Sequence, residues 1–174
     1  AITHYKKAIN IKKDNIAALI NLSTILKEIN NYQELIKIYE KILLLDKKNI
    51  KTIYNLGTAH LFLGNTSKAR ECFENVIKID KHHIPSFRNY VSITVIDKTK
   101  KIFNIFKNIE LSNLDFQNKT LILDALSKCY FDLDETDLAF DYLNKTNSLK
   151  KKQSKFFMKK EKKLFENIKN IFSE

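Results

Sequence analysis

The chain has 174 residues, of which 44% are hydrophobic, and a formal net charge of +11. Two glycines and one proline leave it nearly free of helix breakers, so we expect an all-α protein, and two cysteines exclude a disulfide framework. The sequence has no run of eighteen apolar residues and no signal-peptide start, so we expect neither a membrane span nor export, and we place the chain in the reducing cytoplasm.

The chain repeats itself at a fixed interval, the distance from Asn15 to Asn49, which we call the repeat period. The segments that begin at these two residues align without a gap, and matched positions carry residues of similar character. The aligned pairs include Leu22 with Leu56, Ser23 with Gly57, Asn30 with Gly64, Leu35 with Ala69 and Tyr39 with Phe73. Each segment contains two blocks of apolar residues with helical spacing, separated by a short break. Neither helix can bury its apolar stripe alone, so we expect helical hairpins that stack side by side.

A helix-turn-helix unit of about 34 residues with this pattern resembles the tetratricopeptide repeat. The resemblance implies a right-handed superhelical solenoid whose concave wall is built from the first helix of each unit. It also accounts for the two glycines of the chain. Gly57 would lie where the first helix comes closest to the second, and Gly64 in the turn between them, where a positive φ favours Gly or Asn. The aligned segment that begins at Asn15 has Asn30 at the equivalent turn position.

The register of the repeat divides the chain into six segments. We expect the second helix of a truncated repeat over 1–15, repeats over 16–49 and 50–83, a degenerate hairpin over 84–119, a repeat over 120–153 and a capping helix over 154–174. The capping helix would bury an apolar side formed by Phe157, Leu164, Phe165, Ile168 and Phe172.

The start of the chain carries two further expectations. Its first residue is Ala1 rather than Met, and it begins within a second helix, so we expect a fragment or processed product with repeats missing upstream. The first helix would expose an apolar face there, which offers a surface for end-to-end self-association.

Polar residues recur on the groove-facing side of the first helices. By resemblance, the inward positions are those of Asn21, Asn55 and Asn89, each one repeat period from the next. Three positions later on the same face lie Thr24, Thr58 and Ser92. An Asn side chain donates and accepts hydrogen bonds, as the amides of an extended peptide require. We therefore predict a protein or peptide ligand, with the alternative that Asn is merely tolerated at these positions in an Asn-rich chain.

Four more residues complete the predicted groove: Lys51, Tyr54, Arg88 and, in the last repeat, Lys128. Some chaperone-binding relatives of this repeat clamp two carboxylates with several cationic side chains that converge on a peptide terminus. In this chain Ile20 and Tyr54 lie between the cations, which disfavours such a clamp.

The sequence contains no catalytic motif. It lacks G-x-x-x-x-G-K, C-x-x-C and G-x-S-x-G, so we predict neither an enzyme activity nor a cofactor for this chain. His82 and His83 are adjacent but have no further ligands at a metal-binding spacing, so no metal site is predicted. His60, Cys72 and Cys129 fit core positions.

Eight lysines lie between Lys150 and Lys163. On a helix they can form a basic stripe for nucleic acid or an anionic membrane. Because Phe156 and Phe157 fit packing positions and no nucleic-acid-binding motif occurs, we expect a solvated face and no nucleic-acid partner. Polyanion binding is the weaker alternative.

The segment from residue 111 to 172 resembles a region of bacterial proteins that join tetratricopeptide repeats to a sulfotransferase domain. The resemblance is carried by Ala125, Leu126, Lys128, Asp132, Asp134, Ala139, Phe140, Leu143, Asn147 and Leu149. It implies an alternative function, in which the chain is the substrate-recruiting arm of an enzyme. The catalytic domain, with its Gly-rich loop for the sulfuryl donor, would then lie beyond residue 174.

Overall fold

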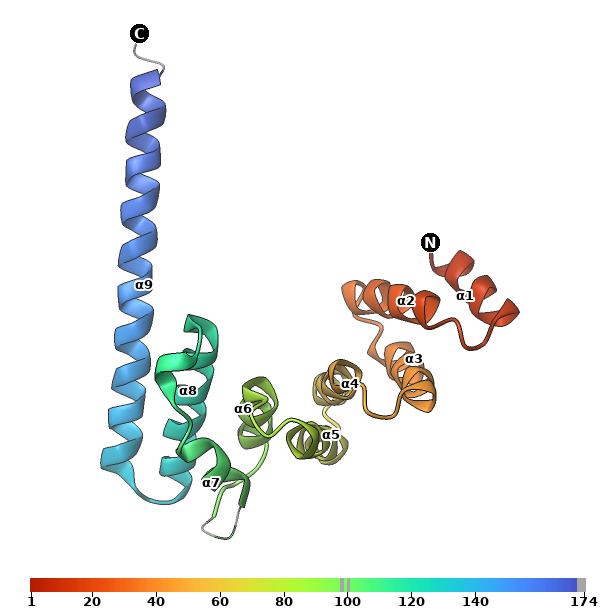
Figure 1. The fold of residues 1–174 in the computed structure, drawn as a ribbon, viewed down its shortest axis with the longest axis horizontal. Helices are drawn as coiled ribbons and strands as arrows, with labels where there is room; N and C mark the ends of the chain where they lie inside the picture. Colours follow the sequence, from red (N-terminus) through yellow and green to blue (C-terminus); the bar gives the residue numbers. More distant parts are fainter. Residues whose placement is uncertain (98, 100, 172–174) are drawn as a thin grey trace. The chain divides into compact units, whose positions relative to one another are not determined.

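The computed structural model describes residues 1–97, 99 and 101–171, with side chains described up to residue 166 except residue 163. Within these ranges the regular elements are all helical (Figure 1), which confirms the all-α prediction. The helices are α1 (Ile2–Ile11), α2 (Ile16–Glu28), α3 (Tyr32–Leu45), α4 (Ile50–Phe62), α5 (Thr66–Ile79), α6 (Ile84–Ser92), α7 (Lys101–Lys107), the 3-10 helix η1 (Leu111–Asn113), α8 (Phe116–Asp132) and α9 (Thr136–Ile171). They form two compact units, residues 1–94 and residues from 95 onward.

In the first unit each helix from α1 to α6 packs against the next one along the chain (Figure 1). The core consists of the positions that recur with the repeat period. The buried aligned pairs include Leu22 with Leu56, Leu35 with Ala69 and Tyr39 with Phe73. Burial of a large apolar side chain stabilises a fold by about 1.5–3 kcal/mol, so the periodic residues supply the main stabilisation of the stack.

The turns between paired helices have the same geometry in both repeats. Asn30 and Gly64 have positive φ angles of 55° and 74°, as predicted for Gly64. The amide after each of them donates back across the helix end, Asn31 N to Leu26 O and Asn65 N to His60 O, both at 2.9 Å. This is the Schellman arrangement, which satisfies the last carbonyls of a helix. Asp134, with a φ of 59°, takes the same position after α8 in the second unit.

The first helices of the repeats begin at capping residues that are also one repeat period apart: Asn15, Asn49 and His83. Each side chain accepts a hydrogen bond from a backbone amide in the first turn. The donors are Ala18 N at 3.0 Å, Thr52 N at 2.9 Å and Ser86 N at 3.2 Å. Some of the asparagines therefore cap the N-termini of helices, where their side chains satisfy backbone amides that have no partner inside the helix.

The predicted close approach at Gly57 is confirmed. A Cβ atom at this position would lie 2.8 Å from Cε1 of Phe73 and 2.9 Å from Cβ of Cys72, both on α5. Equivalent positions in the other hairpins carry serine. Ser23 is buried in α2, and Ser127 in α8 donates from Oγ to the carbonyl of Ala139 on α9 at 2.8 Å.

The apolar face expected to be exposed on the first helix is covered in part. Ile2, Tyr5 and Ala8 pack against the core cluster of the first unit, and Ile9 is buried. The rest of α1 is mostly polar and exposed. The covered part is explained by the periodic apolar residues of a second helix, which face the hairpin that follows as well as the one before. Ile11, by contrast, is 88% exposed.

The segment expected to form a degenerate hairpin over 84–119 is divided between the two units. Helix α6 belongs to the first unit, and α7 and η1 belong to the second. The chain has no helix from Ile93 to Asp97, because the β-branched residues that occupy 93–96 disfavour helix. Instead, Asp97 Oδ1 accepts a hydrogen bond from Thr99 N at 2.8 Å in a local turn.

In the second unit α8 packs against the first turns of α9, and α7 packs against α8. Tyr130 of α8 lies between two aromatic rings. It stacks on Tyr142 with centroids 5.2 Å apart and meets the edge of Phe103 at 5.5 Å. Asp132 accepts a hydrogen bond from Ile96 N at 2.8 Å and forms an ion pair with Lys128. Aromatic and charged contacts therefore join α7, α8 and the segment before α7.

The structure has no helix boundary at residue 154. Helix α9 runs unbroken over 36 residues, so the predicted separate helix over 154–174 is the second half of α9. The reason is that this stretch contains neither Gly nor Pro, so nothing ends the helix. Phe157, Leu164 and Phe165 are exposed, whereas the side chain of Ile168 and all of Phe172 lie outside the described residues. Within the described ranges, no helix has the length and apolar content needed to cross a bilayer.

Replacement of Gly57 by alanine will destabilise the first unit. The added Cβ would overlap Cys72 and Phe73, which costs about 1–3 kcal/mol and exceeds the gain in helix propensity of about 1 kcal/mol. We expect a lower urea midpoint for Gly57→Ala, measured by circular dichroism. The control is Gly64→Asn, because Gly64 has open space around it and Asn30 already adopts this geometry. An equal fall in the urea midpoint of both variants would contradict the explanation by a close contact at Gly57.

The His83 cap makes folding stability depend on pH. Burial lowers the pKa of His83 below its ordinary value of 6.5, opposed by Asp80, and Nδ1 has to be unprotonated to accept from Ser86 N. Burial likewise lowers the pKa of His60. The unfolded chain therefore takes up protons first as the pH falls, so stability is complete above about pH 6.5 and declines below it.

The variant His83→Asn tests this dependence, because Asn15 and Asn49 already serve as caps at the equivalent positions. We expect urea unfolding at pH values from about 7 to about 5 to show a smaller fall in unfolding free energy for the variant than for the parent chain. At neutral pH the two should differ by less than about 1 kcal/mol. Identical pH profiles of the unfolding free energy would show that His83 does not contribute to the pH dependence of stability.

Candidate functional site

A groove of about 310 Å³ lies in the first unit, lined by residues of α2, α3 and α4 together with the cap residue of α4. Tyr39 and Ile42 of α3 contribute an apolar part. Helix α2 contributes Thr24 and Lys27, and α4 contributes Lys51 and Asn55. Among the described residues that line this groove none is acidic, so its fixed charge is positive.

The groove exists because of how the repeat packs. The small Ser23 lets α2 approach α3, and its hydroxyl donates to the carbonyl of Ile20 at 2.7 Å. Burial raises the pKa of Tyr39, and a hydrogen bond with the Ser23 side chain partly offsets the rise. The phenol of Tyr39 is therefore protonated at neutral pH, and it helps to fix the positions of α2 and α3 relative to each other.

The structure gives the three predicted asparagines different surroundings. Asn55 is half-buried and lines the groove, whereas Asn21 is exposed and lies outside its lining. Asn89 is half-buried, and its Nδ2 atom donates to the hydroxyl of Tyr54 at 3.3 Å. The ring of Tyr54 also lies 5.3 Å from the ring of His83. Tyr54 and Asn89 thus form a second polar cluster, between α4 and α6.

The three predicted hydroxyls are each bonded to their own helix. Thr24 donates to Ile20 O at 3.2 Å, Thr58 to Tyr54 O at 3.0 Å and Ser92 to Asn89 O at 2.7 Å. A hydroxyl has one hydrogen and two lone pairs, so these oxygens stay able to accept. These asparagines and hydroxyls, which we call the predicted ladder, are therefore a mixed set: the asparagine amides donate and accept, and the hydroxyls accept.

The three cationic residues predicted for the groove lie in different places. Lys51 lines the groove, and Arg88 is exposed on α6. Lys128 belongs to the second unit, where it pairs with Asp132. The sequence analysis missed Lys27, which lies three positions after Thr24 and therefore on the same side of α2. That spacing was the available signal, but the equivalent position in the next repeat is Leu61, so the repeat period did not reveal it.

The residues considered for chemistry have structural surroundings. Burial raises the pKa of Cys72 to about 11 and that of Cys129 to about 12, so both thiols stay protonated at neutral pH and are poor nucleophiles. His60 is buried in α4, and His83 caps α6. Within the described part of the chain, no three His, Cys, Asp or Glu residues lie close enough together to hold a metal ion.

Comparison with known proteins agrees with this architecture. Two family models, both described as tetratricopeptide repeats, match residues 18–49 and residues 50–83. No curated protein matches the chain.

Several solved structures are similar to the chain. A crystal structure of MamA is 17% identical over 88% of this chain and 89% of its own, with a TM-score of 0.70. YrrB, a tetratricopeptide-repeat protein, is 20% identical over 85% of this chain and 77% of its own, with a TM-score of 0.60. The pilF protein of Pseudomonas aeruginosa is 18% identical over 83% and 65%, with a TM-score of 0.58. At these identities the likeness concerns the fold. Residues 18–83 are thus tetratricopeptide repeats, and the chain has the fold of a tetratricopeptide-repeat solenoid.

Proposed function

We propose that the chain is a protein-interaction scaffold whose first unit binds an extended peptide segment of a partner in the groove of α2, α3 and α4. The observation that carries the proposal is the convergence of Thr24, Lys27, Lys51 and Asn55 on one concave surface without a carboxylate among its described lining residues. YrrB, whose fold is similar, is described as having an unusual peptide-binding site, which supports a peptide as the ligand.

The groove matches the chemistry of a peptide backbone. Each peptide unit offers one N–H and one C=O group that need partners. The carboxamide of Asn55 can bond to either group, and the Thr24 oxygen can accept from an N–H. Lys27 and Lys51 add positive charge on two sides of the groove, so peptides with Asp or Glu residues are the preferred ligands.

Three further proposals follow from the sequence. The repeat-like hairpin over 120–153, the cytoplasmic location and the lack of a catalytic role belong here. The location is supported by two cysteines that are both free, and the non-catalytic role by the two protonated thiols. End-to-end self-association through α1 is a further proposal, supported by Ile11, which is 88% exposed on this helix, while Ile2, Tyr5 and Ala8 are partly buried.

The recruiting arm of a sulfotransferase is the second proposal, and it concerns the whole protein. It rests on the residues that carry that resemblance, and none of the similar proteins named above adds support. It requires that the reading frame continue beyond residue 174 into a domain with a Gly-rich donor-binding loop. Sequencing of the gene downstream of this codon decides it, because a stop codon at that point would exclude the arm.

Substitutions of side chains that line the groove should weaken peptide binding, whereas substitutions outside it should have little effect. Peptides would be selected from a phage-displayed random library and their affinity measured by calorimetry. We expect Asn55→Ala to raise the dissociation constant about tenfold, because loss of one bonded group costs about 1–1.5 kcal/mol. Lys51→Ala should weaken acidic peptides and reduce the salt dependence of binding.

The matched control is Asn21→Ala, which removes the same side chain at the equivalent position of α2 but outside the groove lining. We expect a change of less than about twofold. Equal losses for Asn21→Ala and Asn55→Ala would support a continuous asparagine ladder in place of the localised groove. Unchanged binding in Asn55→Ala and Lys51→Ala would contradict both the localised groove and the asparagine ladder.

A further inference from the structure

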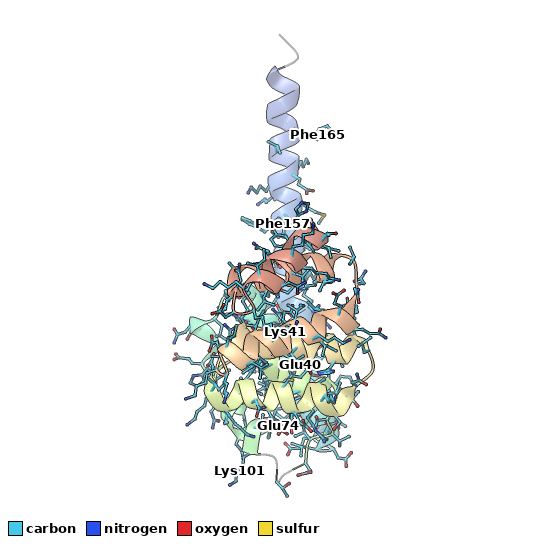
Figure 2. The ribbon with its side chains drawn as sticks, turned by 90° about the vertical axis from the view of Figure 1, so that its right-hand side faces the viewer. Glu40, Lys41, Glu74, Lys101, Phe157 and Phe165 are labelled. Carbon is cyan, nitrogen blue, oxygen red and sulfur yellow. The ribbon has the colours of Figure 1, made fainter. Side chains whose placement is uncertain are left out.

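The second half of α9 presents large apolar side chains to solvent. Phe156, Phe157, Met158, Leu164 and Phe165 are between 51% and 77% exposed. Within the second unit, α8 lies beside the first turns of α9 only, and the helix extends well past it (Figure 1). Phe157 and Phe165 are labelled on this part of the helix in Figure 2. So many exposed aromatic and aliphatic side chains on one short segment mark an interaction site.

Most lysines of the same turns lie on the other side of the helix, but Lys160 lies about 60° from Phe157, on the apolar side. The exposed lysines that form no ion pair with a described residue are Lys151, Lys152, Lys155, Lys159, Lys160 and Lys162. An α-helix turns by about 100° per residue, so Phe157 and Leu164 lie within about 20° of each other. Lys155 and Lys162 then lie about 140–180° away from them. The segment is an amphipathic helix with a basic polar face.

The distribution of charge discriminates among possible occupants. A dry helix–helix interface centred on Phe157 and Leu164 would also bury Lys160 or Glu161, which follow Phe157 by three and four positions. A nucleic acid would contact the lysines but leave the aromatic side chains in water. At the surface of an anionic bilayer, apolar side chains enter the acyl boundary, and the lysine side chains, Lys160 included, extend to the phosphates. The carboxylate of Glu161 stays in the hydrated head-group layer, which a dry interface lacks.

We propose that the second half of α9, from Lys150 to Glu166, binds the surface of an anionic lipid bilayer. The helix lies in the plane of the interface, with Phe157 and Leu164 directed into the bilayer. Its lysines lie at the level of the head groups. This binding is independent of the peptide groove, so each can fail without the other.

Vesicle sedimentation with the full chain tests the proposal. We expect binding to vesicles of equal parts phosphatidylserine and phosphatidylcholine, and much weaker binding to vesicles of phosphatidylcholine alone. Joint replacement of Lys155, Lys159 and Lys162 by glutamine should lower the partition coefficient on the order of 100-fold, because each lysine near an anionic surface contributes to attraction.

The matched control replaces Lys7, Lys12 and Lys13 by glutamine, three exposed lysines of the first unit, and removes the same charge. Only a small loss is expected there. Equal losses in the two triple variants would overturn the proposal, because they would show that net charge alone attracts the protein. Circular dichroism of each variant checks that the helices are intact.

A fluorescent reporter tests insertion separately. The chain contains no tryptophan, so Phe157→Trp introduces a single one. Its emission should shift to the blue on addition of the anionic vesicles, whereas the emission of Phe62→Trp in the first unit should not. No shift for Phe157→Trp, or salt-sensitive binding of RNA with no binding of vesicles, would overturn the proposal.

Discussion

The contact between the two helices of a repeat is the constraint on which the first unit depends. Gly57 leaves no room for a Cβ against Phe73 and Cys72, and Ser23 is the small residue at the equivalent position of α2. Short helix separation at these points determines how the hairpins stack. The same stacking places α3 between α2 and α4, and side chains of these three helices line the groove.

The groove combines polar groups that differ in what they can bind. The hydroxyl of Thr24 is committed to its own helix and can only accept, whereas the amide of Asn55 can also donate. Lys27 and Lys51 add two positive charges. This combination suits an extended acidic peptide better than a small neutral ligand. The second half of α9 adds a surface of another kind, in which most basic residues lie on the side of the helix opposite to Phe157 and Leu164.

The sequence alone predicted the structural features that recur from one repeat to the next. The repeat period predicted the buried pairs, and the resemblance to the tetratricopeptide repeat predicted the positive φ at Gly64 and the close contact at Gly57. It could not distinguish Asn21 from Asn55, because periodicity treats equivalent positions as equal, whereas the groove depends on which neighbouring helix each position faces. It also failed for α9, since the repeat predicts an end near residue 154 but helix continuation depends on local breakers, which are absent there.

The central claim is that a peptide occupies the groove of the first unit, and NMR spectroscopy tests it most directly. A peptide selected for binding would be titrated into the labelled chain, and the shifts of backbone and Asn side-chain amides recorded. We predict the largest changes at Thr24, Lys51 and Asn55. Glu40 on α3 and Glu74 on α5, labelled in Figure 2, do not line the groove and should change little. Shifts concentrated at Glu40 and Glu74, with none at Asn55, would contradict the account.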